Sequence, residues 1–284
     1  LDGAHIQTLH SFCLELVRRH FYELAIDPQA MVLDARQAAL LQRQTLDALL
    51  ERHYRETDER ARAVQALIRE RGRGWDQPVR DVVLRLHAHT RTLRDPASWL
   101  QGQKDLFASP APAAWQAALA AGAAEWRAQW LPILRGWQEE SDGIQALAEL
   151  LGRLPDQPDP ATLARALEEV QAIDDGSLYN RKGAQRALVR PFLNEAAELR
   201  GYLPGGDRDP LAEDWQWVRG QIFCLLEMAE EYELKYTEAK RAQAALDFQD
   251  LEQLALRLLY EPGTDKPTAV ALACDVKMNP AVAA

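Results

Sequence analysis

The chain has 284 residues, 47% of them hydrophobic and 27% charged, which is enough to bury the core of one large domain or two modest ones. Its net charge of −10 argues against a protein whose whole surface binds nucleic acid. Its three cysteines, Cys13, Cys224 and Cys274, are widely spaced without a CxxC pair, which argues against a disulfide framework or zinc site and predicts a cytoplasmic protein.

Alanine, leucine, glutamate, arginine and glutamine dominate the sequence, which predicts an all-α protein, an irregular bundle of many helices. The first helix is expected over residues 6–24, where apolar residues recur at helical spacing and Thr8 or Ser11 can cap the start. An Asp-Pro pair ends this helix, and Asp34 is the predicted N-cap of the second.

Helices separated by breaks rich in glycine and proline are expected through the middle of the chain. After "RERGRGW" a helix is predicted over about 78–93, and "ASPAPAA" then leads into a long helix that carries four tryptophans near one face. These are Trp115, Trp126, Trp130 and Trp137, which we interpret as packing residues of a core or an interdomain seam. Further helices are expected over 161–173, 184–200 and 211–245.

The segment "LDFQDLEQLALRLL" predicts a helix with Asp247 as its N-cap and Asp250 at the N3 position of a capping box. The two acids superficially resemble a magnesium-binding motif. However, no hydrophobic strand is expected before them, and Phe248 stands where a second carboxylate would be needed. We therefore assign both acids a structural role.

Charge is segregated along the chain. Residues 60–94 hold nine arginines against three acidic residues, whereas residues 138–176 hold ten acidic residues against two arginines. This pattern allows a local basic surface on an acidic protein.

Familiar catalytic motifs are missing from the sequence. No segment matches the phosphate-binding pattern GxxxxGK[ST], and neither HExxH nor GxSxG occurs. We therefore predict no catalytic residue, no metal site and no cofactor in this chain. No stretch approaches the ~20 apolar residues of a membrane span, so no membrane partner is expected.

The two ends of the chain resemble a known family. "IQTLHSFCLELVRRH", followed by "IDP" and "VLD", is similar to the TxHxFC segment of superfamily 1A (UvrD-like) DNA helicases, most closely the AddA and RecB helicase-nucleases. "YELKYTEAKRAQAALDFQDLEQLALRLL", residues 232–259, resembles the tract through which the helical insertion of that family, domain 1B, returns to motor domain 1A. The acidic motif II expected after this tract does not follow Leu259, and the tail resembles nothing expected there.

The resemblance implies that the chain is an excerpt of a larger protein. Residues 1–25 would be the end of a 1A segment, 26–240 the helical domain 1B, and 241–284 the return toward 1A with a tail. An insertion leaves and re-enters its host at neighbouring points, so we expect residues 6–20 and 247–259 to lie close together.

The function implied is that of a DNA-handling accessory domain in an ATP-dependent DNA helicase/exonuclease of double-strand break repair and recombination. ATP and Mg²⁺ are expected for the parent, whereas the chain alone should be inactive. The expected partners are duplex DNA near the helicase entry, single-stranded DNA at the 1A border, and a partner subunit of AddB or RecC type.

The candidate DNA contacts come from two sources. Thr8 and His10 match family positions that contact single-stranded DNA; the alternative is that they belong to a capped, packed helix. The candidates from basic tracts are Arg69, Arg71, Arg73, Arg181, Lys182 and Arg186, whose alternative is a solvated helix face. A rival function is a helical scaffold that braces the partner subunit without contacting DNA, favoured by the acidic segment and the tryptophans.

Overall fold

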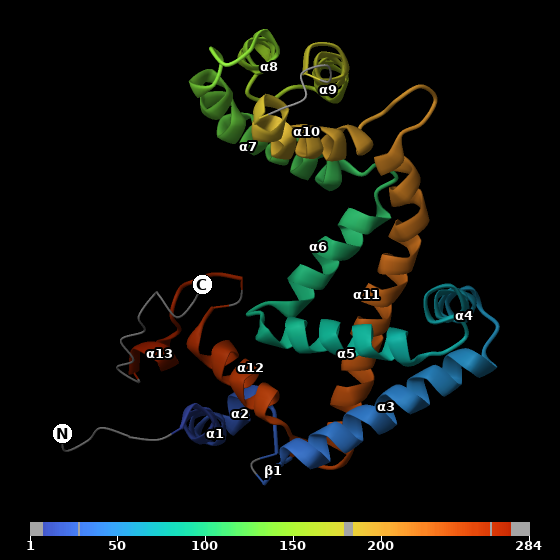
Figure 1. Ribbon diagram of the computed structural model, residues 1–284. Helices are drawn as coiled ribbons and strands as arrows, with labels where there is room; N and C mark the ends of the chain where they lie inside the picture. The colour runs from blue at the N-terminus through green and yellow to red at the C-terminus, as the bar shows by residue number, and fades with distance from the viewer. Residues whose placement is uncertain (1–7, 28, 179–183, 262, 274–284) are drawn as a thin grey trace. The chain divides into compact units, whose positions relative to one another are not determined.

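The computed structural model describes residues 8–27, 29–178, 184–261 and 263–273, and its elements confirm the predicted all-α bundle (Figure 1). The chain divides into two compact units. Unit 1 comprises residues up to Asp105 and from Gln221 onward, and unit 2 comprises Leu106–Gly220. The assignment of residues to domains 1A and 1B stays a prediction.

Unit 1 holds both ends of the described chain, and two helices, α6 and α11, cross from one unit into the other. Its elements are α1 (Leu9–Arg19), α2 (Phe21–Leu24), β1 (Met31–Val32), α3 (Ala35–Arg55), α4 (Glu59–Gly72), α5 (Gln77–Thr92), the start of α6 (Pro96–Ala108), most of α11 (Pro210–Ala242), β2 (Ala245–Leu246), α12 (Phe248–Leu259) and α13 (Ala269–Ala273).

The predicted first helix is in fact two, because the backbone leaves the helical region at His20 and α2 then ends on Ala25 in the left-handed conformation. Asp34 caps α3 as predicted, in a capping box with Gln37. Helices α4, α6 and α13 were not predicted, and the residues of α6 lie in the segment before the predicted linker.

The two border segments lie side by side in unit 1 (Figure 1). Helix α1 packs against α12 through an apolar cluster that includes Leu16, Val17, Leu251 and Leu258. Beside them, β1 and β2 form a parallel pair with Met31 opposite Ala245. The expected proximity of residues 6–20 and 247–259 is therefore confirmed over the described residues, although some 230 residues of sequence separate the segments.

The larger core of unit 1 joins α3, α4 and α5 to α11. Leu46, Val64, Val83, Met228 and Tyr232 are among its buried residues, each at most 1% exposed. The residues of this core recur at helical spacing within each helix, as Met228 and Tyr232 do in α11, so each helix contributes one apolar stripe. Helix α11 contributes Cys224, Met228, Tyr232 and Tyr236 to this core.

Unit 2 is a smaller helical bundle with its own core. Its elements besides parts of α6 and α11 are α7 (Ala113–Gly136), α8 (Asp142–Arg153), α9 (Pro160–Ile173), a π-helical turn η1 (Asp174–Leu178) and α10 (Ala184–Gly201). Trp126 and Trp130 are buried against Phe192 of α10, and Trp137 packs on the edge of the same cluster. The interpretation of the tryptophans as core residues is confirmed for these three.

Trp115, the first tryptophan of α7, lies apart from that cluster. Its ring meets Trp215 edge to face, with ring centroids 5.1 Å apart. The indole N–H of Trp215 donates to the carbonyl oxygen of Ser109 at 2.9 Å, so the two tryptophans hold the start of α7 against the start of α11.

Candidate nucleic-acid interface

The start of α1 exposes the two residues expected to contact single-stranded DNA. Thr8 is exposed and caps the helix, its hydroxyl oxygen accepting from the backbone N–H of Ser11 at 3.3 Å. The His10 side chain is 47% exposed, and its Nε2 lies 3.2 Å from the Glu252 carboxylate of α12. Its ring lies 4.7 Å from that of Phe248, which is 41% exposed. Helix α12 thus holds His10 at the surface, and DNA contact by Thr8 and His10 stays a prediction.

Helix α12 is held in turn by its capping acids. Asp247 accepts from the backbone N–H of Asp250 at 2.8 Å, and Asp250 accepts from that of Asp247 at 3.0 Å. This capping box confirms the structural role predicted for both acids. A strand does precede the two acids, contrary to expectation: β2 has only two residues, too few to give a recognisable strand pattern in the sequence.

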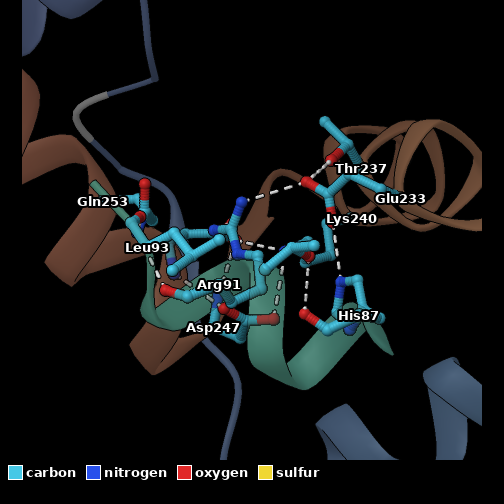
Figure 2. A network of polar contacts seen from close by, with 10 residues as sticks. His87, Arg91, Leu93, Glu233, Thr237, Lys240, Asp247 and Gln253 are labelled. Atoms are coloured by element: carbon cyan, nitrogen blue, oxygen red, sulfur yellow. Dashed lines mark hydrogen bonds and ion pairs between the residues drawn. The ribbon is translucent and has the colours of Figure 1, made fainter. Parts of the chain in front are cut away.

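Both acids also belong to a largely buried ion network that joins α5, α11 and α12 (Figure 2). Lys240, 3% exposed, lies 3.0 Å from Asp247 and 2.6 Å from Asp250. Arg91 bridges Asp250 at 2.8 Å and Glu233 at 3.0 Å. The network therefore joins the return tract to α5, which lies far from it in the sequence.

Further side chains extend the network, among them Thr237, whose hydroxyl donates to Glu233 at 3.2 Å (Figure 2). Nε2 of His87, which is buried, lies 2.6 Å from Glu233. The side-chain amide of Gln253 donates to the carbonyl oxygens of Arg91 and Leu93, both at 2.8 Å, at the end of α5. One feature of the sequence could have indicated this network: charged residues such as Glu233 and Lys240 interrupt the apolar stripe of α11. The sequence does not show which residues pair with them.

The pKa values of the buried acids follow from these contacts. Burial by itself would raise the pKa of Asp247, but the charge of Lys240 and the hydrogen bond from Asp250 N–H outweigh it and lower that pKa. Burial likewise opposes ionisation of Glu233, and the hydrogen bond from His87 and the charge of Arg91 lower its pKa. Both groups are therefore ionised at neutral pH, as a structural role in ion pairs requires.

A cavity of about 430 Å³ opens beside the network and is lined by α2, α5, α11, β2 and α12. Apolar side chains such as Ile26 and Leu254 face it together with Arg241 and Arg257. Its other two cations, Arg91 and Lys240, are already neutralised by carboxylates. We assign it no ligand.

The basic segment 60–94 is much less basic in three dimensions than in sequence. Four of its nine arginines form ion pairs with acids elsewhere in unit 1. The pairs are Arg60 with Glu227 and Glu231, Arg80 with Asp47 and Asp76, Arg91 with Glu233 and Asp250, and Arg94 with Asp265. These arginines stabilise the bundle and leave less charge for a ligand.

Two of the candidate arginines remain available at the end of α4. Arg69 and Arg73 are exposed, and neither side chain makes a hydrogen bond or ion pair with any residue that the structure describes. Arg71 differs, because its Nε donates to the Gln221 side chain of α11 at 2.5 Å. In the other basic tract, Arg181 and Lys182 lie outside the described residues, and so does the side chain of Arg186.

The described residues include no group of three or more histidine, cysteine, aspartate or glutamate side chains arranged to hold a metal ion. Within the same part of the chain, no helix is both long and apolar enough to cross a membrane. Cys13 and Cys224 are buried free thiols, and burial raises the pKa of Cys224 to about 11. A thiol with such a pKa is a poor nucleophile at neutral pH.

The chain is similar in sequence to several known proteins. No family model matches the chain. Among curated proteins, it is 30% identical to the ATP-dependent helicase/nuclease subunit of the AddA type from Moorella thermoacetica, over 96% of this chain. The proteins of the same description from Heliobacterium modesticaldum and Syntrophomonas wolfei are 29% and 28% identical, over 96% and 91% of the chain. Over nearly its whole length, the chain is therefore similar to AddA-type ATP-dependent helicase/nuclease subunits.

The matches to this AddA-type family cover nearly all of the chain but a small part of each relative. The chain spans 21–23% of the length of these three proteins. The resemblance found at the border segments therefore extends through the helical middle of the chain.

Proposed function

We propose that the chain is the DNA-handling domain 1B of an ATP-dependent DNA helicase/exonuclease that acts in double-strand break repair and recombination, with short 1A segments at both borders. The observation that carries the proposal is the match of 91–96% of the chain to a small share of AddA-type helicase/nuclease subunits. The packing of α1 on α12 supports it, because an inserted domain needs neighbouring entry and exit points.

In this proposal the roles divide between two surfaces of unit 1. Thr8 and His10 contact the single strand at the 1A border, and the exposed arginines at the end of α4 contact duplex phosphates. In the parent, ATP and Mg²⁺ drive translocation, and a subunit of AddB or RecC type completes the complex. The chain itself supplies binding and positioning.

The duplex-binding role predicts a specific salt dependence. Replacing Arg69 and Arg73 by alanine should weaken binding to all duplex sequences alike, because phosphate contacts carry no sequence information. If each arginine neutralises one phosphate, the slope of log affinity against log salt should become shallower by about 1.8. The measurement is a salt titration of duplex binding by fluorescence anisotropy, in both the chain and the full-length parent.

The control is the double variant Arg36→Ala and Arg43→Ala, which removes the same charge from exposed positions on α3. It should leave the slope close to that of the unchanged protein. If the two double variants of the parent have equal slopes of log affinity against log salt, Arg69 and Arg73 do not contact phosphates. They would then be solvent-exposed residues without a DNA role, and the scaffold function would be favoured.

A second prediction concerns ATP. The purified chain should neither bind ATP tightly nor hydrolyse it, because phosphoryl transfer needs a phosphate-binding loop and magnesium carboxylates that its sequence lacks. Phosphate release with and without DNA, and calorimetric titration with MgATP, test this. The full-length parent is the positive control, and DNA-stimulated turnover by the chain alone would contradict the prediction.

A further inference from the structure

The turn between α4 and α5 presents a tryptophan to solvent. Trp75 is 77% exposed, and its indole makes no hydrogen bond or ring contact with the residues that the structure describes. Tryptophan side chains are usually largely buried, whereas Trp75 does not contribute to a core. The tryptophans of α7 and Trp215 pack inside unit 2, so Trp75 needs a different explanation.

The turn that carries Trp75 is closely fixed. Arg73 ends α4 in the left-handed conformation, with φ 51°, and its backbone N–H donates to the carbonyl oxygen of Ile68. Gly74 follows with φ 89°, where a side chain would be strained. The backbone N–H of Trp75 then donates to the Gly72 carbonyl oxygen at 2.9 Å. These bonds resemble a glycine-containing helix C-cap and set the direction of the chain at Trp75.

The far side of the turn is fixed as well. The Asp76 carboxylate pairs with Arg80 at 2.9 Å and accepts from the Tyr54 hydroxyl at 3.3 Å. The hydrogen bond from Arg80 holds the pKa of Asp76 below its usual value. An anchored turn loses little conformational entropy when it binds, so Trp75 is well placed to contribute to affinity.

The charge around Trp75 favours an anion with an aromatic face. The side chains of Arg69 and Arg73 are exposed and unpaired within the described chain, and Asp76 is ion-paired with Arg80. Glu70 keeps its charge and accepts from the Gln221 amide at 2.8 Å, so the arginines outnumber the unpaired acid in this part of the chain. An exposed indole that follows Arg73 by two residues and Arg69 by six fits a nucleotide, because the base stacks while the phosphate takes the positive charge. A protein hot spot would instead need a surrounding apolar patch, but the nearest exposed positions in the sequence are polar.

We propose that Trp75 stacks on an exposed base face at the end of duplex DNA, while Arg69 and Arg73 bind the adjoining phosphates. Paired bases inside a duplex offer no free face, so this stacking is confined to ends and unpaired positions. The inference rests on the proposed DNA-binding function and names the structure that the arginine surface prefers.

The test compares two DNAs of the same sequence, a blunt-ended linear duplex and a covalently closed duplex circle that has no ends. Trp75→Ala in the chain and in the parent should weaken binding to the linear duplex by roughly 5- to 150-fold, the range typical of one base stacked on an aromatic residue. Binding to the circle should not change. Trp75→Phe, which keeps an aromatic face, should retain most of the end preference.

Other outcomes separate this inference from the proposed function. The double variant Arg69→Ala and Arg73→Ala should bind both DNAs more weakly, since both contain phosphates. Suppose that the unchanged proteins bind both DNAs. If Trp75→Ala then leaves the affinity for both DNAs unchanged, or lowers both affinities by the same factor, end stacking is wrong while DNA binding stands. If neither unchanged protein binds either DNA, the proposed function fails first. Loss of the partner subunit from the Trp75→Ala parent, with DNA binding intact, would make Trp75 a protein contact and overturn the inference.

Discussion

Replacing Lys240 by methionine is expected to lower the free energy of unfolding of unit 1 by about 3–5 kcal/mol, the usual cost of removing one partner from a buried ion pair. Methionine keeps most of the aliphatic stem but removes the charge that faces Asp247 and Asp250. Arg91 still pairs with Asp250, so Asp247, only 5% exposed, becomes the uncompensated charge.

Urea unfolding followed by hydrogen exchange in α12 measures this effect. Lys235→Met is the matched control, because Lys235 lies on the same helix in an exposed pair with Glu238, and such pairs contribute about 0–1 kcal/mol. Adding Asp247→Asn to Lys240→Met should recover much of the loss, since asparagine can still cap α12 without a charge. If Lys240→Met is no less stable than the control, the network is not a stabilising element.

The same variant should respond differently to pH. In the unchanged protein the pKa values of Asp247 and Glu233 are lowered from their ordinary 3.8 and 4.5, so their contribution is present at neutral pH and is lost as the pH falls below these values. Without Lys240, burial dominates and the pKa of Asp247 should rise. The difference in stability between the two proteins should therefore narrow as the pH falls from 7 toward about 4, and a constant difference would contradict the assigned cause.

Replacing Phe192 by alanine is expected to destabilise unit 2 by about 3–5 kcal/mol, as for other fully buried phenylalanines. Phe192 is 0% exposed, stacks on Trp126 with centroids 5.0 Å apart, and meets Trp130 at 5.6 Å. Its removal leaves a cavity between α7 and α10 and takes away two aromatic contacts.

Hydrogen exchange in α7 and α10 reports this loss locally, and thermal unfolding reports it for the whole chain. Leu188→Ala, on the same helix but 40% exposed, is the control and should change stability by at most about 0.5 kcal/mol. Because the two units have separate cores, the exchange rates of α12 should rise much less than those of α10. Equal losses for Phe192→Ala and Leu188→Ala would mean that Phe192 is not central to this core.

Local features of this protein could be predicted from residue types and their spacing. The N-cap at Asp34 and the capping box of Asp247 with Asp250 followed from local residue types, and the burial of Trp126 and Trp130 followed from helical spacing. Both depend on interactions within one or two turns of helix, so the spacing of the residues is enough to predict them. The break at His20 was missed because a helical apolar pattern continues through it.

Which charges are available to a ligand depends on contacts between distant parts of the chain. Arg91 and Arg69 look alike in the basic segment, yet Arg91 lies between Glu233 and Asp250, more than 140 residues away, whereas Arg69 faces solvent. The pairing of β1 with β2 is likewise non-local and involves two residues from each strand. The residues next to a charged side chain or a two-residue strand in the sequence do not indicate which distant residue pairs with it. The partner is fixed only when the packing of α11 brings distant helices together and makes any unpaired buried charge costly.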